Sequence, residues 1–356
     1  MTHIDLLCRM IATESFSRQE DSTAELIHDY LVANGVEAKR FRNNVYALSD
    51  NFNSSRPTLL LNSHHDTVKP AQTYTRNPFE PSLEGDVLYG LGSNDAGASV
   101  VSLITAFLDL RSAKLPFNLL LALTAEEEVG GENGMRACLP HIAEQGIRID
   151  AAIVGEPTGL QPAVAERGLV VLDAVTEGVT GHAARGEGVN AIYRAMEDID
   201  ILRNFQFPKT SEVLGPISVN ITQINAGWAH NAIPDQCKWV VDVRTTDAYS
   251  NQETADMLQA AVKFSQLTPR STRVRASVIS ESHPLVAECL KMGLKPFVSP
   301  TTSDMSLMYD FPSLKIGPGQ SSRSHSADEF ILLSEITHAI DTYKSLITSI
   351  TKLINL

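Results

Sequence analysis

The sequence lacks the features by which several classes of protein are recognised. Its four cysteines are scattered and form no CxxC pair, so we expect reduced, buried thiols and neither a disulfide framework nor a thiolate zinc site. Acidic residues outnumber basic ones, and the net charge of −13 argues against binding to nucleic acid or to an anionic membrane, both of which require a basic surface. No apolar run approaches the length of a membrane span.

The N-terminal segment and the overall composition indicate an ordinary globular protein. Residues 1–21 have neither a basic start nor a long apolar stretch, so they predict an amphipathic helix and not a signal peptide. Hydrophobic residues make up 43% of the chain and charged residues 20%, as in globular proteins. We therefore expect a cytoplasmic protein, and its 356 residues favour two domains.

Three continuous apolar runs predict buried strands, at residues 58–62, 117–124 and 150–155. Helices are expected between them: one over residues 19–34, capped by Ser17, and one that follows Asp95. Apolar strands that alternate with helices indicate an α/β fold with a mainly parallel, twisted sheet flanked by helices.

The pattern changes after Arg167 and returns near residue 280. Alternating strand candidates and two helical segments predict a compact α+β domain with one exposed sheet face. Beyond it, a helix at 283–293, a strand at 313–317 and a closing helix from Leu333 resume the earlier pattern. We therefore predict one domain of residues 1–165 and 279–356, interrupted by an inserted domain of residues 166–278.

Histidines and carboxylates follow the predicted strands. The carboxyl ends of parallel strands meet at one edge of a sheet, where ligands bind. Nitrogen and oxygen ligands without a thiolate suit zinc, and crowded carboxylates need a cation to offset their repulsion. The residues concerned are His64, His65, Asp66, Asp95, Glu126, Glu127, Glu128, Glu156 and His325.

Each motif alone has a plainer interpretation. The HxD motif at His64 is common as a polar turn, three consecutive glutamates usually form a solvated helix start, and Glu156 before a proline is an ordinary loop residue. Their conjunction at successive strand ends favours a metal site. A dinucleotide-binding fold is excluded because no GxGxxG follows a first strand.

The ordered set SHHDTV, YGLGSNDAG, TAEEEVGG, VGEPT, RG-x13-H, N-x2-P-x9-R and HSADE resembles the dizinc deacylases and peptidases over nearly the whole chain. That family includes acetylornithine deacetylase, succinyl-diaminopimelate desuccinylase, aminoacylase and several exopeptidases. The resemblance implies a zinc aminopeptidase-like catalytic domain with an inserted dimerisation (lid) domain. It also implies two Zn²⁺ ions per subunit, for which Co²⁺ is a substitute.

The resemblance further implies roles for the catalytic-domain residues. Asp66 would orient the ring of His64, and Glu127 would be the general base that moves a proton from water to the leaving amine. The first zinc would be held by His64, Asp95 and Glu156, and the second by Asp95, Glu128 and His325.

For the inserted domain, the resemblance implies that His182 stabilises the oxyanion in the partner subunit of a homodimer, and that Arg167, Asn231 and Arg244 contact the substrate. The plain alternatives are a structural His182, a surface ion pair at Arg244 and a turn at Asn231. The chain departs from the family pattern at Leu91, Gly97, Arg185, Gly186 and His65, none of which is a metal ligand. Arg185 predicts contact with a negatively charged group such as succinyl, although it could also point to solvent.

The activity that fits best is hydrolysis of an N-acyl-L-amino acid, namely N2-acetyl- or N2-succinyl-L-ornithine to ornithine plus carboxylate, as in arginine biosynthesis. A succinyl-diaminopimelate desuccinylase, a dipeptidase and an aminoacylase are the alternatives within the family. A catalytically silent metal-binding protein is the non-enzymatic alternative, and the presence of Glu127 argues against it.

Overall fold

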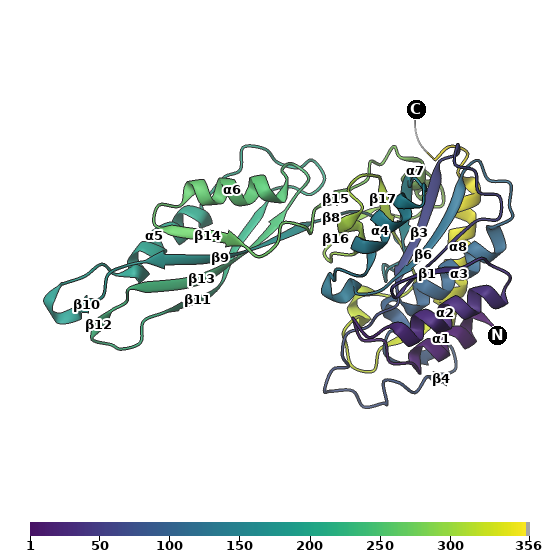
Figure 1. Ribbon diagram of the computed structural model, residues 1–356, viewed down its shortest axis with the longest axis horizontal. Helices are drawn as coiled ribbons and strands as arrows, with labels where there is room; N and C mark the ends of the chain where they lie inside the picture. Colours follow the sequence, from purple (N-terminus) through teal and green to yellow (C-terminus); the bar gives the residue numbers. More distant parts are fainter. Residues whose placement is uncertain (354–356) are drawn as a thin grey trace. The chain divides into compact units, whose positions relative to one another are not determined.

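The computed structural model describes residues 1–353, which divide into two compact units (Figure 1). Unit 1 comprises Met1–Val164, Ile279–Phe297 and the described chain from Ser303 onward. Unit 2 comprises Ala165–Val278 and the short piece Val298–Thr302. Unit 1 therefore draws on both ends of the sequence, and most of unit 2 is one continuous stretch between them.

A mixed sheet forms the centre of unit 1. Within the described residues its order is β1-β2-β6-β3-β7-β17-β8-β15, with β16 paired to β8. The central strands β6, β3, β7 and β17 are parallel, which confirms the predicted α/β sheet, whereas the pairs at both edges are antiparallel. The bounds are β1 Lys39–Phe41, β2 Asn44–Leu48, β3 Thr58–His64, β6 Asn118–Thr124, β7 Ala151–Val154, β8 Ala163–Glu166, β15 Ser277–Val278, β16 Phe297–Ser299 and β17 Ser313–Lys315.

Helices cover both faces of this sheet because its central strands are apolar on both sides. Every residue of β3 is buried: Leu59 and Leu61 pack in one core with α1, α2, α3 and α8, and Leu60 packs in a second core with α4 (Figure 1). The bounds are α1 His3–Ile11, α2 Asp21–Ala33, α3 Ala98–Leu110, α4 Met135–Glu144, α7 Pro284–Lys291 and α8 Leu333–Ser349.

The predicted cap of the second helix was wrong. Helix α2 begins at Asp21, its N-cap is Glu20, and no side chain caps it. Ser17 lies further upstream, and its hydroxyl donates instead to Oδ2 of Asp66 over 2.7 Å. A contact across 49 residues thus replaces the local capping bond that the sequence favoured.

Unit 2 contains a four-stranded antiparallel sheet of order β11-β13-β9-β14, with α5 and α6 on one face. The buried side chains of β9 alternate with half-buried ones, so only one face enters the core, where Trp239 packs. The short pair β10 and β12 lies at one end of the unit (Figure 1). The bounds are β9 Gly168–Glu177, β10 Gly181–His182, α5 Ala191–Arg203, β11 Ser218–Ala226, β12 Ala232–Ile233, β13 Gln236–Thr245, α6 Asn251–Ala261 and β14 Ser265–Pro269.

A small antiparallel sheet joins distant parts of unit 1. Its strands are β4 (Ser82–Glu84), β5 (Val87–Tyr89) and β18 (Phe330–Leu332), in the order β18-β5-β4. Because Phe330 pairs with Tyr89, the segment that follows His325 lies beside the segment that leads to Asp95.

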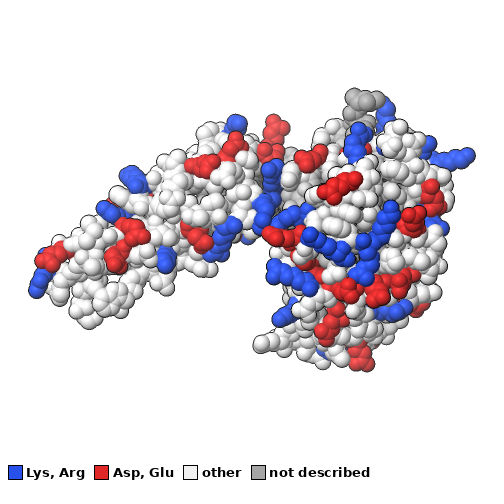
Figure 2. Space-filling model, viewed as in Figure 1, with Lys and Arg blue, Asp and Glu red and all other residues white. Residues whose placement is uncertain are grey.

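The surface carries charges of both signs, and acidic and basic side chains are interspersed over the face in view (Figure 2). All four cysteines are free, and three of them are buried. Among the helices of residues 1–353, none combines the length and the apolar character that crossing a bilayer requires.

Candidate metal centre

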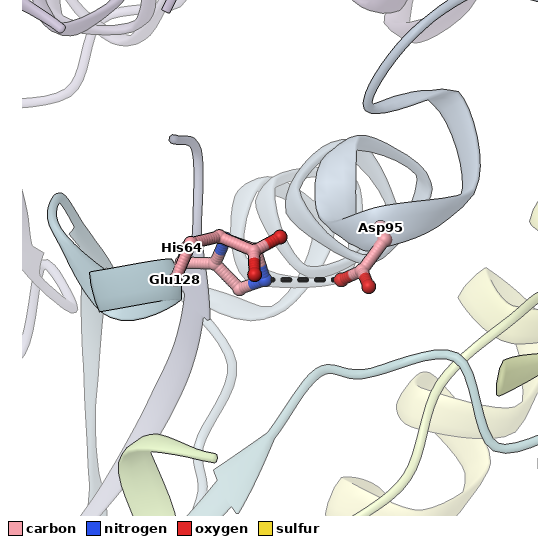
Figure 3. A group of neighbouring side chains, drawn as sticks. All are labelled: His64, Asp95 and Glu128. Atoms are coloured by element: carbon pink, nitrogen blue, oxygen red, sulfur yellow. Dashed lines mark hydrogen bonds and ion pairs between the residues drawn. The ribbon is translucent and has the colours of Figure 1, made fainter. Parts of the chain in front are cut away.

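Parallel strands bring the predicted ligands of unit 1 to one edge of the sheet. His64 is the last residue of β3, Glu127 and Glu128 begin the 3-10 turn after β6, and Glu156 follows β7 by two residues. Asp95 lies in the turn Ser93–Gly97 that leads into α3. Figure 3 shows the side chains of His64, Asp95 and Glu128 together at this edge.

The ring of His64 is oriented by Asp66. Its Nδ1 lies 3.1 Å from the backbone oxygen of Asp66 and 3.4 Å from Oδ1 of the same residue. Both neighbours are acceptors, so Nδ1 carries a hydrogen and donates. Nε2 is then the nitrogen available to a metal, in the usual arrangement of a histidine ligand backed by a carboxylate.

Carboxylates surround Nε2 of His64. It lies 3.1 Å from Oδ1 of Asp95, 3.6 Å from Oε1 of Glu156 and 4.0 Å from Oε2 of Glu127. The His64 side chain is only 1% exposed, so these charges meet where water screens them poorly.

His325 lies on the other side of Asp95. Its Nε2 is 2.9 Å from Oε2 of Glu128 and 3.9 Å from Oδ2 of Asp95, so the two carboxylate oxygens of Asp95 face different histidines. The His325 side chain is 55% exposed, so the centre is open to solvent on this side.

Two sets of ligand-type atoms lie close enough to hold an ion. In each set the atoms are within 4.8 Å of one another. The first set, drawn in Figure 3, is His64, Asp95 and Glu128, and the second is His64, Glu127 and Glu156. Glu127 therefore lies among the candidate ligands, and geometry alone does not separate a base from a ligand at this position.

The electrostatics of the centre favour a bound cation. Burial raises the pKa of Glu156 to about 8, and repulsion from Asp95 and Glu128 adds to the effect. The hydrogen bond with Glu128 raises the pKa of His325 to about 9. Burial alone would lower the pKa of His64, but its contacts with Asp66 and Asp95 outweigh burial and hold it well above the usual value. Crowded buried carboxylates of this kind favour a bound cation, and nitrogen and oxygen donors without a thiolate are a set that suits zinc.

Asp66 supports the turn after β6 as well as His64. Its carboxylate accepts from the backbone N–H of Glu127 over 3.0 Å and from that of Glu128 over 3.2 Å. Sequence reasoning assigned Asp66 to His64 alone and missed Ser17 as its donor. The signal that was present, a serine before a helix, indicated a cap instead.

Two other buried charged residues near the centre were also missed. Asp304 accepts from the hydroxyl of Thr124 over 2.8 Å, and burial raises its pKa to about 6. Lys315 is buried on β17, and its positive charge lowers the pKa of Glu156, opposing the effect of burial. Neither residue belongs to a motif, so no local pattern pointed to them.

The candidate site residues of unit 2 lie on two separate parts of that unit. His182 is exposed on β10, where it pairs with Ala232, and the backbone oxygen of Asn231 accepts from Ala183 over 3.0 Å. Arg185 is exposed in the adjoining turn. Arg244 lies on β13 and donates to both carboxylate oxygens of Asp242, over 2.8 and 3.1 Å.

Arg167, also in unit 2, donates to backbone oxygens of Leu214 and Pro216. Arg167 and Arg244, two of the three arginines that were expected to contact substrate, are thus held by groups of their own unit.

At Gly97, where the chain departs from the family pattern, the surrounding atoms leave no room for a side chain. A Cβ at this position would lie 2.5 Å from the backbone oxygen of Gly92 and 2.8 Å from Cδ1 of Leu7. A side chain at this position would therefore require the Gly92–Gly97 turn and α1 to move apart. Leu91, another departure from the family pattern, is buried.

Comparisons with known proteins agree on one family. The family model described as Peptidase family M20/M25/M40 matches residues 60–349. The chain is 30% identical to an acetylornithine deacetylase of Proteus mirabilis (strain HI4320), over 93% of this chain and 92% of that protein. It is 27% identical to a succinyl-diaminopimelate desuccinylase of Ruegeria sp. (strain TM1040), over 80% of this chain and 74% of that protein.

Solved structures share the fold. Aminopeptidase PepT from Bacillus cereus ATCC 10987 superimposes with a TM-score of 0.77 at 16% identity, covering 97% of both chains. A dinuclear metal-binding peptidase of the M20 family from Bacillus subtilis gives a TM-score of 0.74 at 18% identity, covering 99% of this chain and 98% of that one.

Proposed function

The chain belongs to peptidase family M20/M25/M40, and from that membership we propose that it hydrolyses the amide bond of an N-acyl-L-amino acid. Members of this class are metallohydrolases that act as deacylases or peptidases. The observation that carries the proposal is the cluster of carboxylates around the buried Nε2 of His64 at the strand ends. A relative that this chain matches over 93% of its length is named acetylornithine deacetylase, which favours an acylated amino acid over a peptide.

We propose two zinc ions that share Asp95. The first would be held by His64, Asp95 and Glu156, and the second by Asp95, Glu128 and His325. The contacts of Asp95 with both histidines support this assignment, because a shared carboxylate must present one oxygen to each side. Bound zinc would supply a Lewis acid for the scissile carbonyl and an acidified water.

Glu127 is proposed as the proton carrier. Its carboxylate takes a proton from the attacking water as the C–O bond forms, and gives that proton to the amine nitrogen as the C–N bond breaks. In the metal-free protein, burial, with Glu156 and Asp304 nearby, raises the pKa of Glu127 well above its ordinary value. The products are a free amino acid and a carboxylate.

The preferred substrates are N2-acetyl- and N2-succinyl-L-ornithine. The deacetylase similarity favours the ornithine series, while similarity to desuccinylases keeps N-succinyl-diaminopimelate as the second candidate. A catalytically silent metal-binding protein is disfavoured by the presence of Glu127.

An assay of the zinc-reconstituted protein tests the function. The panel is N-acetylornithine, N-succinylornithine, N-succinyl-diaminopimelate, N-acetylcitrulline and a set of dipeptides, with release of free amine as the readout. We expect the highest kcat/KM on an ornithine derivative. Turnover of dipeptides alone would reassign the chain as a peptidase, and a metal-loaded protein without any turnover would favour the silent alternative.

Unit 2 is proposed to be a lid that pairs two copies of the chain. Strand β11 is the edge of its sheet, and Ile224 on that strand is 57% exposed. Helix α5 packs beside β11 and exposes Tyr193 and Met196, at 67% and 58%. A strand with one free edge next to exposed apolar side chains suits a two-fold contact. Pairing would allow His182 to serve the partner's centre, with hinges near residues 166 and 278.

A further inference from the structure

The backbone of the Asp95 turn is held by a single buried carboxylate, that of Glu329. Oε1 of Glu329 accepts from the backbone N–H of Asn94 over 2.8 Å and of Asp95 over 2.9 Å, and Oε2 accepts from Gly92 over 3.0 Å. Glu329 is 2% exposed, so water does not compete for these bonds. Three converging amides satisfy one carboxylate and define the path of the turn.

Asp95 depends on such a contact because helix α3 does not set its conformation. The helix begins three residues later, at Ala98, and Asp95 has φ −122° and ψ 96°, which are extended values. The direction of its side chain therefore follows from the path of the turn. That direction matters because one oxygen lies 3.1 Å from His64 and the other 3.9 Å from His325.

Glu329 also belongs to the segment that carries His325. At the beginning of that segment, the side chain of Asn94 accepts from the backbone N–H of Gln320 over 2.9 Å and donates to the backbone oxygen of Gln320 over 3.2 Å. The Asp95 turn and the His325 segment are thus joined on both sides of His325. Two ligand-bearing loops that lie 230 residues apart, from Asp95 to His325, are positioned as one body.

The neighbouring residue Asp328 makes a comparable set of bonds elsewhere. Its carboxylate accepts from the backbone N–H of Thr75 over 2.9 Å and of Arg76 over 3.0 Å, and from the hydroxyl of Thr75. These bonds hold a different loop, and none of them reaches the Asp95 turn. Asp328 therefore offers a matched control for a general loss of loop structure.

We propose that Glu329 is a positioning residue for the metal pair, which fixes the turn so that the single carboxylate of Asp95 faces both histidines. This inference rests on the proposed function, since it presumes two metal ions that share Asp95. In Glu329→Gln the side chain keeps its length and shape but has only one acceptor oxygen. Its NH₂ group would therefore face a backbone N–H of the turn where the second carboxylate oxygen now accepts. The turn would then lose at least one hydrogen bond, and the side chain of Asp95 would lose its orientation.

Titration of the metal-free protein with Co²⁺ tests the proposal without turnover. The wild type, Glu329→Gln and Asp328→Asn are followed by the visible absorption of Co²⁺ and by calorimetry. We expect two equivalents on the wild type and on Asp328→Asn with equal affinity. Loss of an outer contact to a ligand typically costs about 10–100-fold in metal affinity, and we expect that loss in Glu329→Gln for at least one equivalent, with an altered spectrum.

Each outcome decides between the two proposals. A wild type that binds fewer than two ions overturns the proposed dinuclear centre itself. Two ions bound equally well by the wild type and Glu329→Gln overturn only the role of Glu329, as does an equal loss in Asp328→Asn. If circular dichroism shows that Glu329→Gln is unfolded, the titration is read on Glu329→Asp, whose shorter side chain cannot reach all three amides; wild-type affinity in that folded variant would also overturn the role.

Discussion

The backbone N–H of Glu127 donates to Oδ1 of Asp66 over 3.0 Å, and the same oxygen lies 3.4 Å from Nδ1 of His64. One carboxylate thus supports the ring of a proposed ligand and the backbone of the proposed base. The contact reaches Glu127 through its main chain, so a change of the Glu127 side chain leaves this support in place.

Glu127→Gln should therefore fold normally and keep two metal ions, but turn over substrate on the order of a thousandfold more slowly, because both proton transfers use this group. Measurement of kcat together with metal content separates the two effects. Glu128→Gln is the matched comparison and should lose metal affinity instead. A fall in kcat of less than tenfold, or loss of metal from Glu127→Gln, would mean that Glu127 is not the base.

Removal of the metal should abolish activity and leave a protein whose stability falls as pH rises. In the metal-free state the pKa of Glu156 is about 8, above its ordinary 4.5, and that of His325 is about 9, above its ordinary 6.5. Both groups bind protons more tightly when folded, so their contribution is complete below the ordinary values and is lost as pH rises through about 8 and 9.

We therefore expect a lower Tm for the metal-free protein at pH 9 than at pH 6. Asp66 and Asp95, whose pKa values are lowered, titrate below this window. Because zinc replaces the protons, the gain in Tm on adding zinc should be larger at pH 9. Thermal melts of both forms at the two pH values check this. A flat Tm, or activity that survives exhaustive chelation, would contradict the prediction.

Arg185 should favour a substrate with a negative charge in its acyl group. A charge-assisted hydrogen bond to a succinyl carboxylate is worth about 1.5–3 kcal/mol, or roughly 10- to 150-fold. We expect Arg185→Ala to lose that factor in kcat/KM for N-succinylornithine and to leave N-acetylornithine unchanged. If the ratio of the two substrates is the same in both proteins, Arg185 points to solvent.

His182→Ala should lower turnover by about 10²–10³-fold, the usual cost of removing one donor to an oxyanion. If His182 serves the partner's centre, mixing this variant with Glu127→Gln should restore activity. A mixed dimer then has one site that lacks both groups and one that has both. Dimers that are shown to be mixed and yet remain inactive would place the action of His182 within its own chain, or exclude it.

The central strands were predictable because they are buried on both faces, so their middle residues, 59–61 and 119–123, are apolar without interruption. The edge strands of this sheet could not be predicted in the same way. Strands β1 and β2 are short, and their antiparallel direction follows from a two-residue connection that composition does not reveal.

The sheet edge at which the candidate ligands meet could be predicted from the positions of the strand ends. The supporting contacts of Ser17 and Asp304 could not be predicted in this way. Those contacts join residues 49 and 180 positions apart, and no local pattern encodes them. Glu329 is an intermediate case: it lay within the quoted HSADE motif, but its three amide partners are visible only in the folded chain.

The division of unit 1 between the two ends of the sequence affects how the protein is made. On the ribosome, β3, β6 and β7 emerge with Asp95 and the glutamates, but β17 and Glu329 are synthesised only after all of β9–β14. The nascent N-terminal half therefore exposes a row of carboxylates and an open sheet edge at β7, where β17 later pairs. By the proposed assignment, the second metal site is complete only after His325 has been synthesised, and a truncated chain that ends before residue 325 would lack one of its ligands.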